Sequence, residues 1–167
     1  MSGSRRRQIL VDFAKWTALS ALRSGSPIKS RSEVYPLLDA VDFTRVLRPG
    51  PPIAEKAFEE WHEEQTRGLC TRNYDVPIGW GAKLINVFLK TAAYAGDLGR
   101  PGLRRVLHPP IDRGLWDGLR ERFPDQPDML REACCVRRIR DITNYETYRR
   151  IIAGCRTAAK GSRMSPD

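Results

Sequence analysis

Lys83 is the side chain whose position in this sequence is hardest to explain by structure alone. It stands at the start of a run with the spacing of an apolar helix, made by Leu84, Ile85, Phe88, Leu89 and Ala92. A lysine is poorly placed in a first helical turn, because the positive end of the helix dipole repels an ammonium group. That repulsion and the apolar neighbours favour the neutral amine, which is the nucleophilic form. Lys83 is therefore a candidate nucleophile, and a surface lysine is the alternative.

Asp112 is the carboxylate that could serve this amine. It comes after Pro109-Pro110-Ile111 and precedes the apolar residues Leu115, Trp116 and Leu119, which is the position of a helix N-cap. Taken alone, this pattern favours a capping role over catalysis. Because a capping carboxylate stays ionised, both roles are open to Asp112.

Two glycines precede Lys83, in the segment Pro77-Ile78-Gly79-Trp80-Gly81-Ala82-Lys83. A nucleotide-binding loop is the weakest interpretation, because a dinucleotide fingerprint needs a strand and a third glycine, and a P-loop needs Gly-Lys-Ser/Thr. A flexible turn that merely starts a helix is a second interpretation. A third interpretation, a DNA-binding hairpin, depends on the residues around Asp112.

With the later Pro109-Pro110-Ile111-Asp112 and Trp116, the segment resembles the helix-hairpin-helix DNA glycosylases, and most of all their 8-oxoguanine branch. In that branch, a hairpin of type Pro-Gly-x-Gly-x-Lys precedes a helix and then Val-Pro-x-Asp. The resemblance covers residues 77–116. The sequence departs from the family pattern at Ile78, which separates the proline from the first glycine, and in a longer connection between Lys83 and Asp112.

The resemblance implies that Lys83 is the catalytic nucleophile and Asp112 the catalytic aspartate. The hairpin, with Pro77, Gly79 and Gly81, would hold a DNA phosphate through backbone N–H groups. Lys83 would attack the sugar carbon C1′ of a flipped-out modified or damaged nucleotide, and Asp112 would stabilise the charge on the sugar. The implied activity is a glycosylase that forms a lysine Schiff base, with strand nicking as an optional AP-lyase step. The amine and the carboxylate should then meet in one concave cleft.

Several other side chains are candidates for contact with a flipped base. Trp80 and Trp116, with Tyr145 and Tyr148, could stack on it, although buried aromatic residues usually belong to the core. His108, just before two prolines, could approach the mouth of the cleft. We place His62 on the surface, because it lies in a segment rich in glutamate.

The basic charge of the chain is concentrated at its two ends. The 167 residues carry a formal charge of +9, and residues 1–31 hold seven basic side chains against one acidic. Residues 131–163 hold nine against three. Folded onto one side, the two ends would form a footprint for double-stranded or lesion-bearing DNA, whereas a solvated basic surface is the simpler alternative. A non-catalytic DNA-binding module of the same fold is the second hypothesis, and a protein-interaction domain working through Glu59–Glu64 the third.

Composition predicts neither a metal nor a cofactor. The four cysteines show no C-x-x-C pairing and no disulfide framework, and only two histidines accompany them. No stretch reaches the roughly 20 apolar residues of a membrane span. We expect an intracellular monomer, cytoplasmic or nucleoid-associated, with no membrane partner.

Helical spacing dominates the chain and predicts an all-α fold of six or seven helices with a helix-hairpin-helix element. One domain over residues 1–160 would include the hairpin and catalytic segment 77–116, and residues 161–167 would form a flexible tail. Capping boxes are expected at Ser30 and Thr143. The expected helices are 9–22, 31–38, 53–67, 84–92, one after Asp112, 129–136, and 144–160. Residues 95–110 are expected to form a long loop, broken by a short turn at 103–107.

Overall fold

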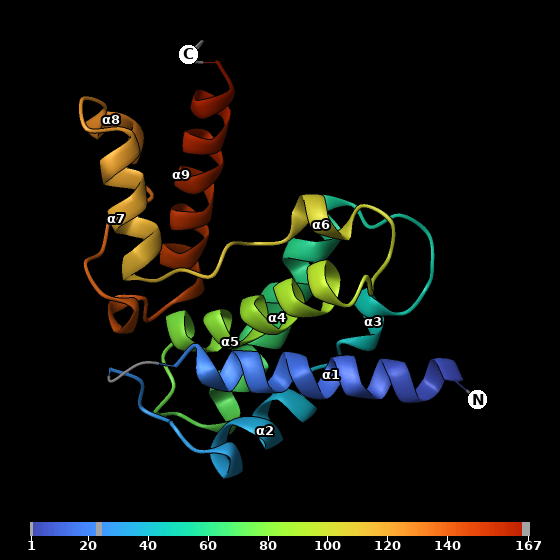
Figure 1. The fold of residues 1–167 in the computed structure, drawn as a ribbon. Helices are drawn as coiled ribbons and strands as arrows, with labels where there is room; N and C mark the ends of the chain where they lie inside the picture. The colour runs from blue at the N-terminus through green and yellow to red at the C-terminus, as the bar shows by residue number, and fades with distance from the viewer. Residues whose placement is uncertain (1, 23–24, 165–167) are drawn as a thin grey trace.

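The computed structural model describes residues 2–22 and 25–164, and this part of the chain is helical without any strand (Figure 1). Two short irregular helices accompany the α-helices: a π-helix at Thr91–Ala95 and a 3-10 helix at Ile139–Asp141. The α-helices of the described residues are α1 (Ser2–Ser20), α2 (Arg31–Asp39), α3 (Thr44–Leu47), α4 (Glu55–Arg72), α5 (Ile78–Lys90), α6 (Leu103–Val106), α7 (Arg113–Arg122), α8 (Pro127–Leu130) and α9 (Tyr145–Met164). The all-α class is therefore confirmed, with more and shorter helices than expected.

Helix α5 lies at the centre of the fold, because it is apolar around almost its whole circumference. Eleven of its thirteen residues are buried. Leu84, Ile85 and Phe88 belong to a core shared with α1, α2 and α4, whereas Ile78 and Ala82 belong to a second core shared with α9. In Figure 1, α1 lies along α5, and α7 and α9 stand side by side beyond its beginning. A side chain on α5 can therefore face either half of the molecule.

The expected hairpin is not present at the two glycines. Gly79 and Gly81 lie inside the first turn of α5, whose N-cap is Pro77. A Cβ atom on Gly79 would lie 2.3 Å from the carbonyl oxygen of Ile139, and one on Gly81 would lie 2.8 Å from Sγ of Cys70. The Gly79 N–H donates to the carbonyl of Ile142 at 2.9 Å. Both glycines therefore allow close packing of neighbouring segments, and the N–H of Gly79 is not free for a phosphate.

The expected helix ends are partly right. The capping box of Ser30 and Glu33 is confirmed, and so is the N-cap at Asp112. Helix α4 continues past Gly68, where the expected helix stopped, because Gly68 keeps helical backbone geometry and does not adopt the left-handed conformation of a C-cap glycine. The helix expected over 129–136 is reduced to α8.

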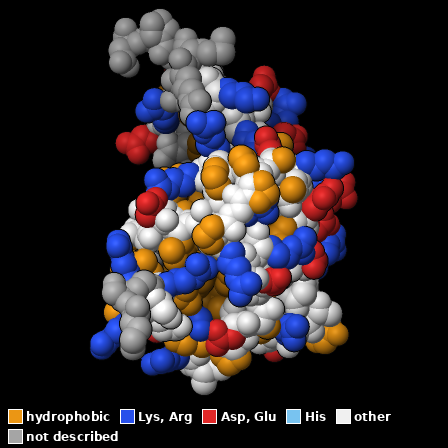
Figure 2. Space-filling model, turned by 90° about the vertical axis from the view of Figure 1, so that its right-hand side faces the viewer, with side chains coloured by type: hydrophobic (Ala, Val, Ile, Leu, Met, Phe, Trp, Pro, Cys, Tyr) orange, Lys and Arg blue, Asp and Glu red, His pale blue; other side chains and the backbone are white. Residues whose placement is uncertain are grey.

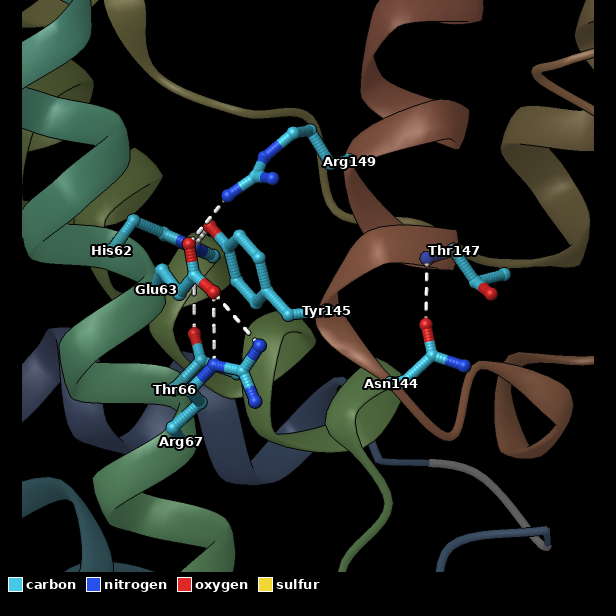
Figure 3. Close-up of polar contacts among 8 residues, drawn as sticks. All are labelled: His62, Glu63, Thr66, Arg67, Asn144, Tyr145, Thr147 and Arg149. Atoms are coloured by element: carbon cyan, nitrogen blue, oxygen red, sulfur yellow. Dashed lines mark hydrogen bonds and ion pairs between the residues drawn. The ribbon is translucent and has the colours of Figure 1, made fainter.

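The start and end of the last helix also differ from expectation. The residue that caps α9 is Asn144 and not Thr143, because the Asn144 Oδ1 accepts the N–H of Thr147 at 2.8 Å (Figure 3). Helix α9 continues to Met164, and Gly161 packs against Met129. Residues 161–164 are therefore helical, and residues 165–167 of the expected tail lie outside the described part.

Some of the basic charge of the C-terminal segment is paired with acidic side chains inside the fold. Arginines of α9 pair with the acidic residues of α4: Arg149 with Glu63, and Arg156 with Glu55 and Glu59. The acidic side of α4 is thus partly covered by the basic helix α9. Figure 2 shows basic side chains mixed with acidic ones over one face of the molecule. Charges that are separated along the sequence are paired in the fold.

Candidate active site

Lys83 and Asp112 meet in space. The Nζ atom of Lys83 lies 3.3 Å from the Oδ2 atom of Asp112, which is within the range of an ion pair. The side chain of Lys83 is only 4% exposed, whereas that of Asp112 is 42% exposed. The amine is therefore buried, and its acidic partner remains open to solvent.

Asp112 has two functions in the structure, one for each of its carboxylate oxygens. Its Oδ1 accepts the backbone N–H of Leu115 at 3.0 Å and so caps α7. Its Oδ2 accepts a hydrogen bond from Lys83. The two roles that the sequence left open are thus compatible, and the cap holds the carboxylate in one orientation toward the amine.

The ion pair lies on the wall of a cavity of about 440 Å³. Such a volume is typical of sites for small ligands, which span about 300–1,000 Å³. The cavity is open to solvent and lies between α1, α5, the π-helix and the segment before α7. Its lining residues are Phe13, Thr17, Ala21, Lys83, Val87, Lys90, Thr91, Tyr94, Ala95, Pro110 and Asp112.

The π-helix shapes one side of this cavity. It continues α5 directly and supplies Thr91, Tyr94 and Ala95 to the lining. The hydroxyl groups of Thr91 and Thr17 lie 2.8 Å apart, which ties the π-helix to α1. One-turn π-helices are frequent at functional sites. Two exposed aromatic rings, Phe13 and Tyr94, border the opening.

Both tryptophans of the sequence hypothesis lie in the core and not on the cavity wall. Trp116 is 2% exposed, and its Nε1 donates to the carbonyl of Ala133 at 2.8 Å. Trp80 is 4% exposed, with its ring centroid 5.5 Å from Nζ of Lys83. Its Nε1 is buried and finds no partner among the described residues. The ring of Trp80 therefore stabilises the ammonium group of Lys83 by a cation–π contact.

A buried hydrogen-bond network adjoins the ion pair. His62 was expected on the surface but is fully buried, and it contacts the hydroxyl of Tyr145 at 2.7 Å and Oδ1 of Asn86 at 2.8 Å. An amide oxygen can only accept, so the Nε2 of His62 carries the proton and its Nδ1 accepts from Tyr145. Burial lowers the pKa of His62 to about 4. This histidine is therefore uncharged at neutral pH.

The other half of the network reaches His108. Its Nδ1 lies 3.0 Å from the hydroxyl of Tyr148, and its Nε2 lies 3.4 Å from the Arg156 guanidinium. Burial, together with His62 and Arg156, lowers the pKa of His108 to about 2. Tyr148 is fully buried, and burial raises its pKa well above the ordinary value. The two tyrosines predicted as stacking residues are thus part of the core.

The network holds the segment that carries Asp112. Asn86 lies one turn after Lys83 on α5, and its Nδ2 donates to the carbonyl of Pro109 at 3.2 Å and to the Tyr148 hydroxyl at 2.8 Å. Two residues separate Pro109 from Asp112. Helix α5 therefore contacts this segment twice, at Pro109 through Asn86 and at Asp112 through Lys83.

The network ends at the surface in a group of charges (Figure 3). Glu63 pairs with Arg67 at 2.8 Å and with Arg149 at 2.5 Å. Both guanidinium groups also lie over the ring of Tyr145, at 5.8 and 5.6 Å from its centroid. These contacts join α4 to α9 and cover the outer end of the buried network.

Neither metal ligation nor a reactive thiol is indicated in the described part of the chain. It contains no group of three or more His, Cys, Asp or Glu residues that could hold a metal ion. The four cysteines are free, and burial raises the pKa of Cys70 and of Cys155 to about 11. Among the described helices, none is both long enough and apolar enough to cross a membrane.

Sequence reasoning missed three residues of this region. Phe13 and Tyr94 border the cavity, and Asn86 anchors the segment that leads to Asp112. A polar Asn86 within an apolar helix was a signal, because a buried amide needs partners. The position of Tyr94 could not be predicted from helical spacing, because Tyr94 lies in a π-helix, which departs from the spacing of an α-helix.

The comparisons with known proteins identify no relative. No protein-family model matches the chain, and no match was found among curated proteins or among solved structures. A function for this chain is therefore inferred from the geometry of the site and from the resemblance of residues 77–116.

Proposed function

We propose that the chain is a DNA glycosylase-like enzyme that removes a modified or damaged base through a Schiff base on Lys83. The observation that carries this proposal is the buried amine of Lys83, 3.3 Å from the carboxylate of Asp112, on the wall of a cavity with aromatic residues at its opening. The formal charge of +9 supports a polyanionic substrate. The two glycines give the proposal no support.

The proposed reaction uses Lys83 as nucleophile and Asp112 as its proton acceptor. A proton passes from the Lys83 ammonium to Oδ2 of Asp112, and the free lone pair attacks C1′ of a flipped-out nucleotide. The N–C1′ bond to the base breaks as the new Nζ–C1′ bond forms. The departing base keeps the electron pair and takes up the proton from Asp112. The C1′–O4′ bond then breaks, O4′ takes up a proton from Nζ, and the resulting protonated imine between Nζ and C1′ is the Schiff base. Water hydrolyses this imine, or loss of a C2′ proton and of the 3′ phosphate by β-elimination leaves a nicked strand.

The cavity suits one planar heterocycle. Its opening has Phe13 on α1 and Tyr94 on the π-helix, and stacking on aromatic rings is a common way to hold a flipped base. The ammonium of Lys90, which is exposed, lies on the same wall and could hold a backbone phosphate. Thus the lining offers an amine for the sugar, rings for the base and a cation for the backbone.

Borohydride trapping tests the proposal. Reduction during incubation with DNA that carries an abasic site or a damaged base should give a covalent protein–DNA complex. Lys83→Ala should abolish the complex and leave DNA binding in place. Lys56→Gln is the matched control, because Lys56 is an exposed lysine on α4 that does not line the cavity.

A binding-only protein is the alternative, and it is favoured by the low exposure of the Lys83 side chain. That alternative predicts DNA binding with a steep loss in salt and no trapped complex with any substrate. Binding without such salt dependence would contradict both functions.

A further inference from the structure

A second cavity adjoins the one that holds Lys83. It has a volume of about 300 Å³ and is lined by Lys90, Tyr94, Leu107, His108, Pro109 and Pro110. Lys90, Tyr94 and Pro110 also line the first cavity. Because these walls are shared, the two cavities are neighbouring lobes of one depression. We call them the Lys83 lobe and the His108 lobe.

The His108 lobe is suited to an apolar ring and not to a phosphate. Leu107, Pro109 and Pro110 give it apolar walls. His108 adds a ring that is uncharged at neutral pH, because burial lowers its pKa to about 2. The charged group of the lining is Lys90, which belongs to the boundary with the other lobe.

The boundary between the lobes combines an aromatic ring with a cation. The Tyr94 hydroxyl donates to the carbonyl of Arg104 at 3.3 Å, and the Arg104 guanidinium lies 5.4 Å from the ring centroid. These contacts hold the exposed ring in place. Lys90 is exposed and makes no ion pair with the described residues. The order along the depression is therefore a ring site, a cation and a second ring site.

We infer that the His108 lobe binds the base next to the target base, so that the site takes two consecutive nucleotides of an unpaired strand. The phosphate between them would lie on Lys90. This inference rests on the proposed function and specifies its substrate class as single-stranded or locally unpaired DNA, because both bases must leave the duplex stack. Stacking on an aromatic ring is tolerant of sequence, so the neighbouring base is not read.

Binding of single-stranded probes tests the inference without any catalytic step. One probe is a short oligodeoxynucleotide with a single tetrahydrofuran abasic residue between thymines. The other replaces both neighbouring thymines by further tetrahydrofuran residues. Loss of the neighbouring bases should weaken binding to the unaltered protein by about 5- to 150-fold, the range that corresponds to stacking of one base.

Three variants distinguish the His108 lobe from other sources of this difference. Leu107→Trp fills the lobe and should remove most of the difference between the probes, and so should Tyr94→Ala. Tyr74→Ala is the matched control, because Tyr74 is an exposed tyrosine that lines neither lobe, and it should keep the full difference. In addition, Lys90→Gln should lower the slope of binding against salt by about one phosphate contact.

The outcomes separate this inference from the proposed function. The inference is wrong if the unaltered protein, Leu107→Trp and Tyr94→Ala all show the same difference in binding between the two probes. This holds even if borohydride traps Lys83. A difference that depends on Leu107 and Tyr94 without any trapped complex would support the lobe and overturn the chemistry. Failure to bind either single-stranded probe would overturn the inference, whereas borohydride trapping of Lys83 on duplex DNA would still support the proposed function.

Discussion

Replacing Asp112 separates its two roles, because asparagine can cap a helix but cannot carry charge. Asp112→Asn keeps an oxygen for the N–H of Leu115 and removes the carboxylate from Lys83. Asp112→Ala removes both. Both variants therefore lack the ion pair, and they differ from each other by the N-cap alone.

The expected magnitudes depend on burial. Breaking a fully buried ion pair costs about 3–5 kcal/mol, whereas exposed pairs contribute about 0–1 kcal/mol. Lys83 is 4% exposed and Asp112 is 42% exposed, so water screens this pair from one side only. We therefore expect Asp112→Asn to lower the free energy of unfolding by about 1–3 kcal/mol. Asp112→Ala should lose about 1 kcal/mol more, which is the usual contribution of an N-cap.

Urea unfolding followed by circular dichroism measures these differences. Lys83→Met in the Asp112→Asn background is the decisive control, because it removes the ammonium that would otherwise be buried without a partner. The double variant should be more stable than Asp112→Asn alone. If Asp112→Asn unfolds like the unaltered protein and only Asp112→Ala is weakened, Asp112 is a cap and the electrostatic argument is wrong.

Three further predictions concern the packing and the buried network. Gly79→Ala should lower the melting temperature by several degrees, because its Cβ would lie 2.3 Å from the Ile139 oxygen. Gly68→Ala, at an uncrowded position within α4, should instead be stabilising by about 0.5–1 kcal/mol. Equal effects of the two substitutions would contradict the packing role of Gly79. The fold should lose stability as the pH falls from about 6.5 toward 4. The unfolded chain takes up protons on His62 and His108 in this range, whereas the folded chain does not, because burial lowers the two pKa values to about 4 and about 2. A melting temperature that stays constant between neutral pH and pH 4.5 would refute this. Asn86→Ala should be destabilising by about 2 kcal/mol or more, because it leaves buried partners of the amide unpaired. It should also lower the yield of trapped complex per folded molecule. An unchanged yield would show that Asn86 does not position Asp112.

Local features of the sequence predicted the all-helical class and two of the three expected caps. The apolar spacing after Lys83 predicted α5, and the pattern around Ser30 and Glu33 predicted a capping box that the structure contains. The N-cap at Asp112 was predicted for the same reason, since side-chain capping is a local interaction. The order of Lys83 and Asp112 along the chain also suggested that the two residues would meet, and they do.

Features that depend on tertiary contacts were not predictable in this way. The two glycines look alike in a turn and in a packed helix, and only the approach of Ile139 and Cys70 distinguishes the two cases. His62 lies among glutamates, so its burial depends on Asn86 and Tyr145, which are distant in the sequence. The basic C-terminal segment predicts a binding surface, but two of its arginines, Arg149 and Arg156, pair α9 with α4.

The identity of the lysine that reacts tests the central claim most directly. The chain contains six lysines, and two of them, Lys83 and Lys90, line the same cavity. After borohydride trapping with abasic DNA, nuclease and protease digestion followed by mass spectrometry should find the reduced sugar on Nζ of Lys83. Lys90→Gln should still form this adduct, and Lys83→Gln should not. An adduct on Lys90 or on surface lysines, or no adduct at all, would contradict the account.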